Sequence, residues 1–123
     1  MRPLKPTWQT DDSTIRLYLG DCKEIAPMFP EMSTDMVVTS PPYWNQKEYS
    51  HWPTYEQYMA DVDKWVAECA RVLKPGRHCF WVIPDKLPWP PKENGGKERL
   101  YMPIYADTEQ VAANHGLVCK FPI

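Results

Sequence analysis

The chain has 123 residues, which corresponds to one small domain, because domains usually contain about 100 to 200 residues. Hydrophobic residues make up 43% of the chain and charged residues 24%, a composition that supplies a core and excludes a disordered protein. The formal net charge is −2, which excludes a global positive field for holding nucleic acid, so any contact with DNA must be local.

No apolar stretch is long enough for a transmembrane helix, and residues 1–6 contain no apolar segment typical of a signal peptide. These features predict a cytoplasmic protein without a membrane partner. The four cysteines lack the CxxC spacing of a metal site. We therefore predict no bound metal and four reduced core thiols, at Cys22, Cys69, Cys79 and Cys119.

The N-terminal part predicts a strand, a short helix and a second strand. Apolar residues alternate over 14–19, and the Gly20-Asp21 pair that follows indicates a turn. A helix is predicted over 22–28, because a proline two residues later cannot continue it. The next segment, 35–39, is an unbroken apolar run, which is typical of a strand buried on both faces of a parallel sheet.

The clearest helix spans 55–73, where apolar residues recur at spacings of three and four. Thr54 and Gln57 form a capping-box pattern at its start, and Pro75-Gly76 ends it. The following apolar run predicts a second buried strand, over 79–83. Strand, helix and strand with this spacing form a βαβ crossover, so the two strands should be parallel.

The C-terminal part predicts a long loop, a helix and a strand. Residues 84–103 contain five prolines and several basic residues, so we predict an irregular loop. A helix is expected over 107–115, capped by Asp107 or Thr108, and a final strand over 117–121. The whole chain is therefore predicted to form a single α/β domain with a mainly parallel sheet.

The motif Ser40-Pro41-Pro42-Tyr43-Trp44 directly follows the second predicted strand, and ligands bind beyond the carboxyl ends of such strands. The two prolines fix two φ angles and remove two N–H donors, so this loop is a rigid array of acceptors. Tyr43 and Trp44 offer aromatic faces for a planar ring. An acceptor array beside an aromatic face suits a planar molecule with an exocyclic amine, and it needs no separate nucleophile.

A Pro-Pro-Tyr string can also be a ligand of WW domains or a simple turn at the end of a strand. Its position between a buried strand and a capped helix favours a binding site.

Three motifs together resemble the amino-methyltransferases of DNA. They are Leu-Gly-Asp-Cys at 19–22, Ser-Pro-Pro-Tyr-Trp at 40–44 and Leu-Lys-Pro-Gly at 73–76. The resemblance is to the permuted (beta) group, in which the catalytic motif precedes the glycine-rich cofactor motif. It extends from about residue 14 to residue 123 but covers only the N-terminal half of such an enzyme. It implies part of a three-layer, Rossmann-like, S-adenosylmethionine-dependent methyltransferase fold.

The resemblance implies that Ser40 and the Pro41 carbonyl bind the target amine, while Tyr43 stacks on a flipped base. The amine nitrogen would then attack the methyl group of S-adenosylmethionine. Serine at the first motif position favours cytosine N4 over adenine N6 as the target. The implied site residues are Ser40, Pro41, Pro42 and Tyr43 for catalysis, Asp21 and Thr39 for the cofactor, and Trp44 and Lys86 for the substrate.

The sequence departs from this family in its glycines. None of the five forms the Gly-x-Gly turn that the methionine end of the cofactor requires, and the expected target-recognition region is missing. We therefore expect a fragment, a truncated gene or half of a split enzyme, whose partners are DNA and a complementary half carrying the glycine-rich motif. An uncovered sheet edge also predicts a homo-oligomer.

Two alternatives remain open at this point. The first is a catalytically inactive remnant or binding half. The second is an RNA or protein-glutamine methyltransferase, because the same acceptors and aromatic face suit any planar amide or amine.

Overall fold

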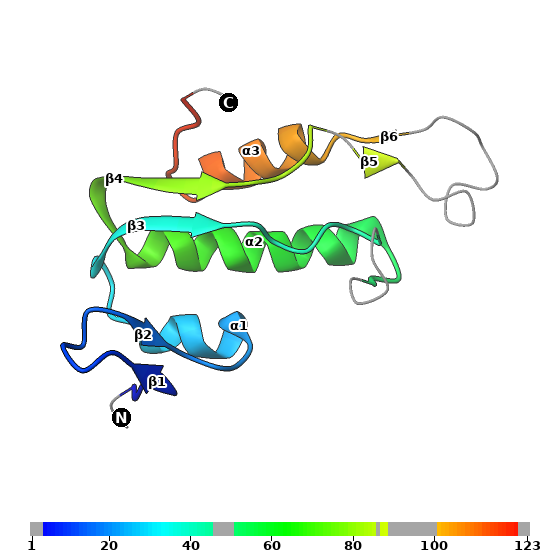
Figure 1. Ribbon diagram of the computed structural model, residues 1–123. Coiled ribbons are helices and arrows are strands. Elements are labelled where there is room, and N and C mark those ends of the chain that lie inside the picture. The colour runs from blue at the N-terminus through cyan, green and yellow to red at the C-terminus, as the bar shows by residue number, and fades with distance from the viewer. Residues whose placement is uncertain (1–3, 46–50, 86, 89–100, 121–123) are drawn as a thin grey trace.

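The computed structural model of the chain describes residues 4–45, 51–85, 87–88 and 101–120. Figure 1 shows the order of its elements. Their bounds are β1 Trp8–Gln9, β2 Arg16–Leu17, α1 Cys22–Ile25, the 3-10 helix η1 Ala26–Met28, β3 Thr34–Thr39, α2 Tyr55–Val72, β4 Leu73–Trp81, β5 Leu87–Pro88, β6 Tyr101–Met102 and α3 Ile104–Asn114. No helix in these described ranges is both long and apolar enough to cross a membrane.

The centre of the fold is a parallel pair of strands, β3 and β4, which α2 connects. The predicted βαβ unit is thereby confirmed. The register places Val38 opposite Phe80 and Thr39 opposite Trp81, so the carboxyl ends of both strands lie at the same edge. Strand β4 starts at Leu73, earlier than the predicted run 79–83, because the chain becomes extended directly after α2.

Helix α2 confirms the helix predicted over 55–73. The Thr54 side chain accepts a hydrogen bond from the Gln57 backbone N–H at 3.2 Å, which is the N-cap that the sequence indicates. Near the other end, Arg71 bonds to the Glu68 carboxylate at 2.9 Å and to the Ala26 carbonyl at 2.9 Å. This arginine therefore ties the end of α2 to the 3-10 helix.

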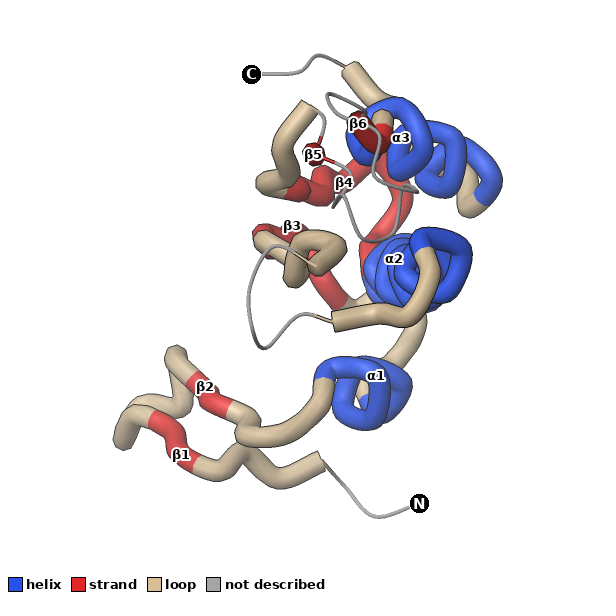
Figure 2. The backbone as a smooth tube through the Cα atoms, turned by 90° about the vertical axis from the view of Figure 1, so that its right-hand side faces the viewer, coloured by secondary structure: helices blue, strands red, loops and turns tan. Residues whose placement is uncertain are grey.

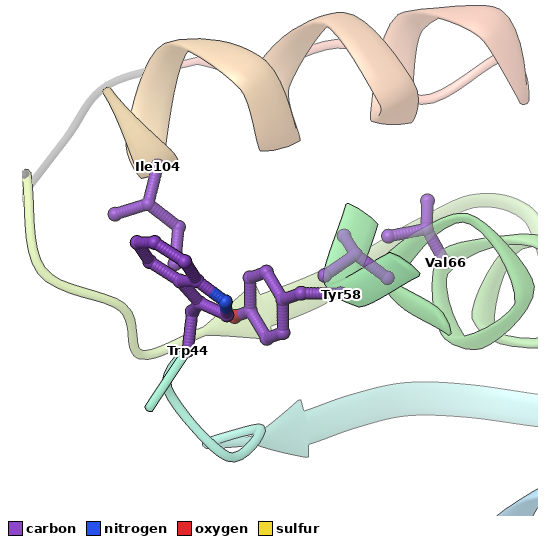
Figure 3. Close-up of a cluster of buried hydrophobic side chains, with 5 residues drawn as sticks. Trp44, Tyr58, Val66 and Ile104 are labelled. Carbon is purple, nitrogen blue, oxygen red and sulfur yellow. The ribbon is translucent and has the colours of Figure 1, made fainter. Parts of the chain in front are cut away.

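The hydrophobic core lies between α2, α3 and the loop that follows β3 (Figure 3). Its buried members are aromatic or branched residues with at most 2% of their surface exposed, namely Trp44, Tyr58, Val62, Val66 and Ile104. Because these residues come from three segments far apart in the sequence, the core holds the loop after β3 against both helices.

The described helices lie on the same side of β3 and β4 (Figure 2). Two layers of the Rossmann-like fold are therefore described. The prediction that these strands are buried on both faces is wrong for the side away from the helices, because no described element covers it. Apolar side chains of these strands are accordingly exposed. Met36 is 58% exposed, Val38 64%, Phe80 43% and Val82 57%.

The N-terminal strand is shorter than the predicted 14–19. Only β2 is formed there, and it pairs antiparallel with β1 in a hairpin that the sequence analysis missed. Asp12 closes the turn by accepting hydrogen bonds from the side chains of Thr10 at 2.6 Å and Thr14 at 2.8 Å. These bonds lower the pKa of Asp12 to about 2. The alternating apolar residues of this segment are more than half exposed, at Ile15, Leu17 and Leu19.

The segment after this strand folds as predicted. Helix α1 and the 3-10 helix together occupy the range 22–28. The prediction of four core thiols is wrong for Cys22 and Cys119, which are exposed. Cys69 and Cys79 are partly buried.

The C-terminal part departs most from the predictions. Helix α3 starts at Ile104, with Pro103 at the N-cap position, so neither Asp107 nor Thr108 caps it. Asp107 instead accepts a hydrogen bond from the Tyr55 hydroxyl at 2.7 Å, which links α3 to α2. Thr108 is buried inside the helix, where it faces the core side rather than the helix end.

The predicted strand over 117–121 is absent from its described residues, 117–120. The Leu117 N–H bonds back to the Ala112 carbonyl at 3.0 Å, which turns the chain at the end of α3, and no described strand lies beside it. The predicted loop 84–103 is partly regular, because β5 and β6 form a short antiparallel ladder. Residues 86 and 89–100 of this loop lie outside the described residues.

The contact between Tyr55 and Asp107 gives a test of how α2 and α3 are joined. Tyr55→Phe should destabilise the chain by about 1.5–3 kcal/mol, because it removes a hydrogen bond to a charged group. Tyr105→Phe is the control, since the partner of its hydroxyl among the described residues is the exposed thiol of Cys119, and it should cost less than about 0.5 kcal/mol. Urea unfolding followed by circular dichroism measures both. Equal losses would contradict the role of the Tyr55 hydroxyl.

Candidate functional site

The candidate site lies where β3 and β4 end together. Past the last pair of the ladder, the Val82 N–H donates to the Thr39 carbonyl at 2.9 Å, which extends the pairing by one residue. The motif that begins at Ser40 therefore starts beside Val82. This is the carboxyl edge of the parallel pair, where the sequence predicts a site.

Three oxygen atoms converge at this edge. The hydroxyls of Ser40 and Tyr43 donate to the Val82 carbonyl at 3.3 Å and 3.2 Å, and they lie 3.4 Å from each other. Carbonyl and hydroxyl oxygens both accept hydrogen bonds, so an amine that enters this cluster meets acceptors from two elements. Ser40 and Tyr43 are predicted site residues, whereas the Val82 carbonyl is not, because a backbone acceptor has no residue-type signature in the sequence.

Helix α2 contacts the motif at its second proline. The Tyr58 hydroxyl donates to the Pro42 carbonyl at 3.1 Å, and the Tyr58 ring is buried in the core. Burial raises the pKa of Tyr58, so the hydroxyl keeps the proton that it donates. Pro41 is buried and Pro42 is exposed, so the loop turns outward between them.

The side chain of Trp44 does not lie in the site. It is 1% exposed, and its ring packs edge-on against Tyr55 with 5.2 Å between centroids. Figure 3 shows it beside Tyr58 and Ile104. The prediction that Trp44 stacks on a substrate is therefore wrong for this structure, because the indole fills the core between α2 and α3.

Beyond Trp44, a side-chain amide closes the loop. Asn45 adopts a left-handed conformation with φ of 49°, which asparagine tolerates better than most residues. Its amide donates to the Trp52 carbonyl at 2.9 Å and accepts from the Trp52 N–H at 2.6 Å. The Trp52 indole then donates to Asp61 at 3.0 Å. None of these three residues is among the predicted site residues, and only the asparagine carries a local sequence signal.

A cavity of about 910 Å³ lies between α1, β3 and α2. Its walls include five of the predicted site residues, namely Asp21, Thr39, Ser40, Pro41 and Pro42. Asp21 also accepts a hydrogen bond from the Lys23 N–H at 2.8 Å, as the N-cap of α1. Tyr43 and Trp44 are not among the lining residues, and Lys86 lies outside the described residues.

Charged and thiol groups from α1, α2 and β4 meet around this cavity. The two carboxylate oxygens of Asp61 each lie 3.8 Å from a lysine ammonium nitrogen, one from Lys23 and one from Lys64. The negative charge of Asp61 is therefore balanced by two lysines. A hydrogen bond from the Cys79 thiol lowers the pKa of Cys69, which lines the cavity.

Residues 34–89 match the DNA methylase family model, which covers N6 and N4 methyltransferases. The chain is 38% identical over 71 residues to the Type II beta methyltransferase M.BslI of Bacillus sp. (strain NEB-606), which covers 58% of this chain and 8% of that protein. It is also 36% identical over 84 residues to the Type II methyltransferase M.BamHI of Bacillus amyloliquefaciens. This match covers 65% of this chain and 19% of M.BamHI.

Over these stretches the chain is similar to DNA methyltransferases, one of which is named a Type II beta methyltransferase. Its fold agrees, because the chain resembles the crystal structure of TTHA0409 of Thermus thermophilus, named as a putative DNA modification methylase. In the form of TTHA0409 complexed with S-adenosyl-L-methionine, the TM-score is 0.66 at 31% identity, over 80% of this chain and 38% of TTHA0409. The chain thus spans less than half the length of these methyltransferase relatives.

The buried position of Trp44 predicts a structural rather than a binding role. Trp44→Ala should destabilise the chain by about 3–5 kcal/mol, as for other buried aromatic residues. Trp8→Ala is the matched control, because Trp8 is 54% exposed, and it should cost about 1 kcal/mol or less. Urea denaturation of both variants measures the difference. If Trp44→Ala lowered the free energy of unfolding as little as Trp8→Ala does, a structural role for Trp44 would be contradicted.

Proposed function

We propose that this chain supplies the base-binding loop of a DNA amino-methyltransferase, which transfers a methyl group to the exocyclic amine of a flipped base. The observation that carries the proposal is the convergence of the Ser40 hydroxyl, the Tyr43 hydroxyl and the Val82 carbonyl at the carboxyl edge of β3 and β4. The match to DNA methylases over residues 34–89 supports it.

In this proposal, the chain orients the amine and stabilises the charge that it gains. The two N–H groups of the amine replace the hydroxyl donors and bond to the Ser40 and Val82 oxygens. S-adenosylmethionine, when bound, supplies an electrophilic methyl group, so that the new N–C bond forms as the S–C bond of the sulfonium breaks. The nitrogen becomes positively charged and then releases one proton to solvent. Oxygen acceptors aimed at this nitrogen stabilise the transition state more than the bound substrate.

The cavity suits one end of this cofactor. The Asp21 carboxylate is an acceptor at the wall, and Val37 and Trp65 contribute apolar surface. Ligand cavities combine such apolar walls with a few polar groups. Glycine suits position 20 in the adjoining turn, because a Cβ atom there would lie 2.7 Å from the Ile25 side chain. The methionine end has no matching glycine-rich turn in this sequence.

Cytosine N4 is the favoured target, and the support for it is Ser40 at the first motif position. DNA and a complementary half with the glycine-rich motif are the proposed partners. Duplexes that carry a single cytosine or a single adenine target distinguish the two bases. Methyl transfer to RNA or to a glutamine peptide in place of DNA would favour the other methyltransferase classes.

The catalytic prediction separates stacking from hydroxyl chemistry, in the chain joined to a complementary cofactor-binding half. Tyr43→Ala should weaken base binding by about 1–3 kcal/mol through lost stacking, whereas Tyr43→Phe should be mild. Ser40→Ala should lower turnover more than DNA affinity, because its oxygen acts on charge that develops in the transition state. Methyl transfer to single-target duplexes and DNA binding are measured in parallel.

An unchanged rate in both Tyr43→Ala and Ser40→Ala would identify the motif as a turn only. The proposed function would then give way to that of an inactive remnant.

The cofactor prediction concerns the chain by itself. It should bind S-adenosylmethionine only at millimolar concentration or not at all, because no backbone turn holds the methionine end. Calorimetric titration measures this binding, with S-adenosylhomocysteine as a second ligand. A micromolar dissociation constant would show that the cavity beside Asp21 is a complete cofactor site.

A further inference from the structure

A series of hydrogen bonds ties the end of the base-binding motif to helix α2. Asn45 directly follows the motif, and its amide bonds to the Trp52 carbonyl at 2.9 Å and to the Trp52 N–H at 2.6 Å. The Trp52 indole N–H in turn donates to the Asp61 carboxylate at 3.0 Å. We call Asn45, Trp52 and Asp61 the loop clamp. Because Asp61 belongs to α2, the loop clamp attaches the motif to a helix far along the chain.

Asp61 holds its neighbours mainly through the indole hydrogen bond. Its carboxylate also faces Lys23 and Lys64, but both ion pairs span 3.8 Å, and these lysine side chains are 41% and 68% exposed. Exposed ion pairs contribute little, because water and salt screen them. The indole bond is partly buried, and an indole N–H without an acceptor there would cost more. The bond to Trp52 is therefore the contact through which Asp61 can fix a position.

The Trp52 ring also packs on the residue that contacts the motif from α2. It meets the Tyr58 ring edge-on with 4.9 Å between centroids, and the Tyr58 hydroxyl donates to the Pro42 carbonyl at 3.1 Å. Trp52 thus reaches the motif by two routes, through Asn45 after the last motif residue and through Tyr58 at the second proline. A shift of the indole would disturb both routes.

We propose that Asp61 is a positioning residue for the base-binding loop, because it fixes the Trp52 indole and Trp52 in turn holds Asn45 and Tyr58. The inference rests on the proposed function, since the loop that is positioned is the one that binds the base there. A misplacement of about 1 Å at reacting groups can lower a rate about a hundredfold. Asp61 therefore acts on turnover through the loop and not by contact with the base.

The first test measures hydrogen exchange at the Trp52 backbone N–H of the full chain by NMR. Asp61→Leu keeps the branched side-chain skeleton but removes the acceptor, and it should speed this exchange at least about fivefold, because local opening becomes easier. Asp61→Asn keeps an acceptor oxygen and should change the exchange less than about twofold. Asn45→Gly removes the acceptor of this N–H itself and gives the rate of the released group.

Asp63→Leu is the matched control for this test. It makes the same substitution two residues further along α2, where the carboxylate lies 2.8 Å from the His115 ring nitrogen and outside the loop clamp. The lost charge and the added apolar surface are the same, so exchange at Trp52 should stay unchanged. Circular dichroism verifies that each variant is folded.

The second test measures methyl transfer in the chain joined to a complementary cofactor-binding half. Asp61→Leu should lower kcat about tenfold or more, with a change of less than about threefold in KM for the duplex, because loop position orients the amine while phosphate contacts dominate duplex affinity. Asp61→Asn should restore most of the rate. In an Asn45→Gly background, Asp61→Leu should have little further effect, because the link through which Asp61 acts is already broken.

The inference is overturned if Asp61→Leu leaves exchange at Trp52 unchanged, if Asp63→Leu speeds it equally, or if the joined chain methylates DNA with the same kcat in Asp61→Leu. It is also overturned if the effects of Asp61→Leu and Asn45→Gly on kcat are additive. Faster exchange in Asp61→Leu, together with no methyl transfer by the joined unsubstituted chain, would support the loop clamp and contradict the proposed function.

Discussion

Tyr58 joins the candidate site to the core through two parts of one side chain. Its ring is 1% exposed between α2 and α3, and its hydroxyl donates to the Pro42 carbonyl at 3.1 Å. The two prolines have no N–H groups, so their carbonyls are the backbone polar atoms that remain to be satisfied. Because the ring cannot shift without disturbing the core, the motif is held from the helix side. The β3–β4 pairing holds it from the strand side.

This double attachment explains why the acceptor cluster is compact. The Val82 carbonyl belongs to the segment after β4, while the Ser40 and Tyr43 hydroxyls follow β3, and only the parallel register brings them within 3.2–3.4 Å. A shift of one residue in that register would turn every side chain of one strand to the other face. The geometry of the site therefore depends on the sheet as much as on the motif.

The sequence predicted the elements whose signals are local. Helix α2 has a periodic apolar face and a side-chain cap, and β3 is a continuous apolar run that a proline pair ends. Exposure was not predictable in the same way, because whether an apolar strand is covered depends on which other elements are present. The start of α3 was also missed. Its N-cap position is a proline, and the expected cap, Asp107, instead bonds to Tyr55 on another helix.

Within the candidate site, too, residues that belong to a short motif could be predicted, and a residue whose role depends on packing could not. Ser40, Pro41 and Tyr43 follow from a short motif at the end of a strand. Trp44 was predicted as a substrate contact because aromatic residues suit both stacking and burial, and only the packing of α3 decides between the two.

Asn45 has a consequence for how the loop after the motif can vary. Its amide fixes both backbone groups of Trp52, so the two ends of this loop are joined by one side chain regardless of the residues between them. Loop-closure entropy grows slowly with length, and a doubling costs only about 0.6 kcal/mol. Insertions between these two residues should therefore be tolerated, so a peptide tag placed there should not displace the acceptor cluster.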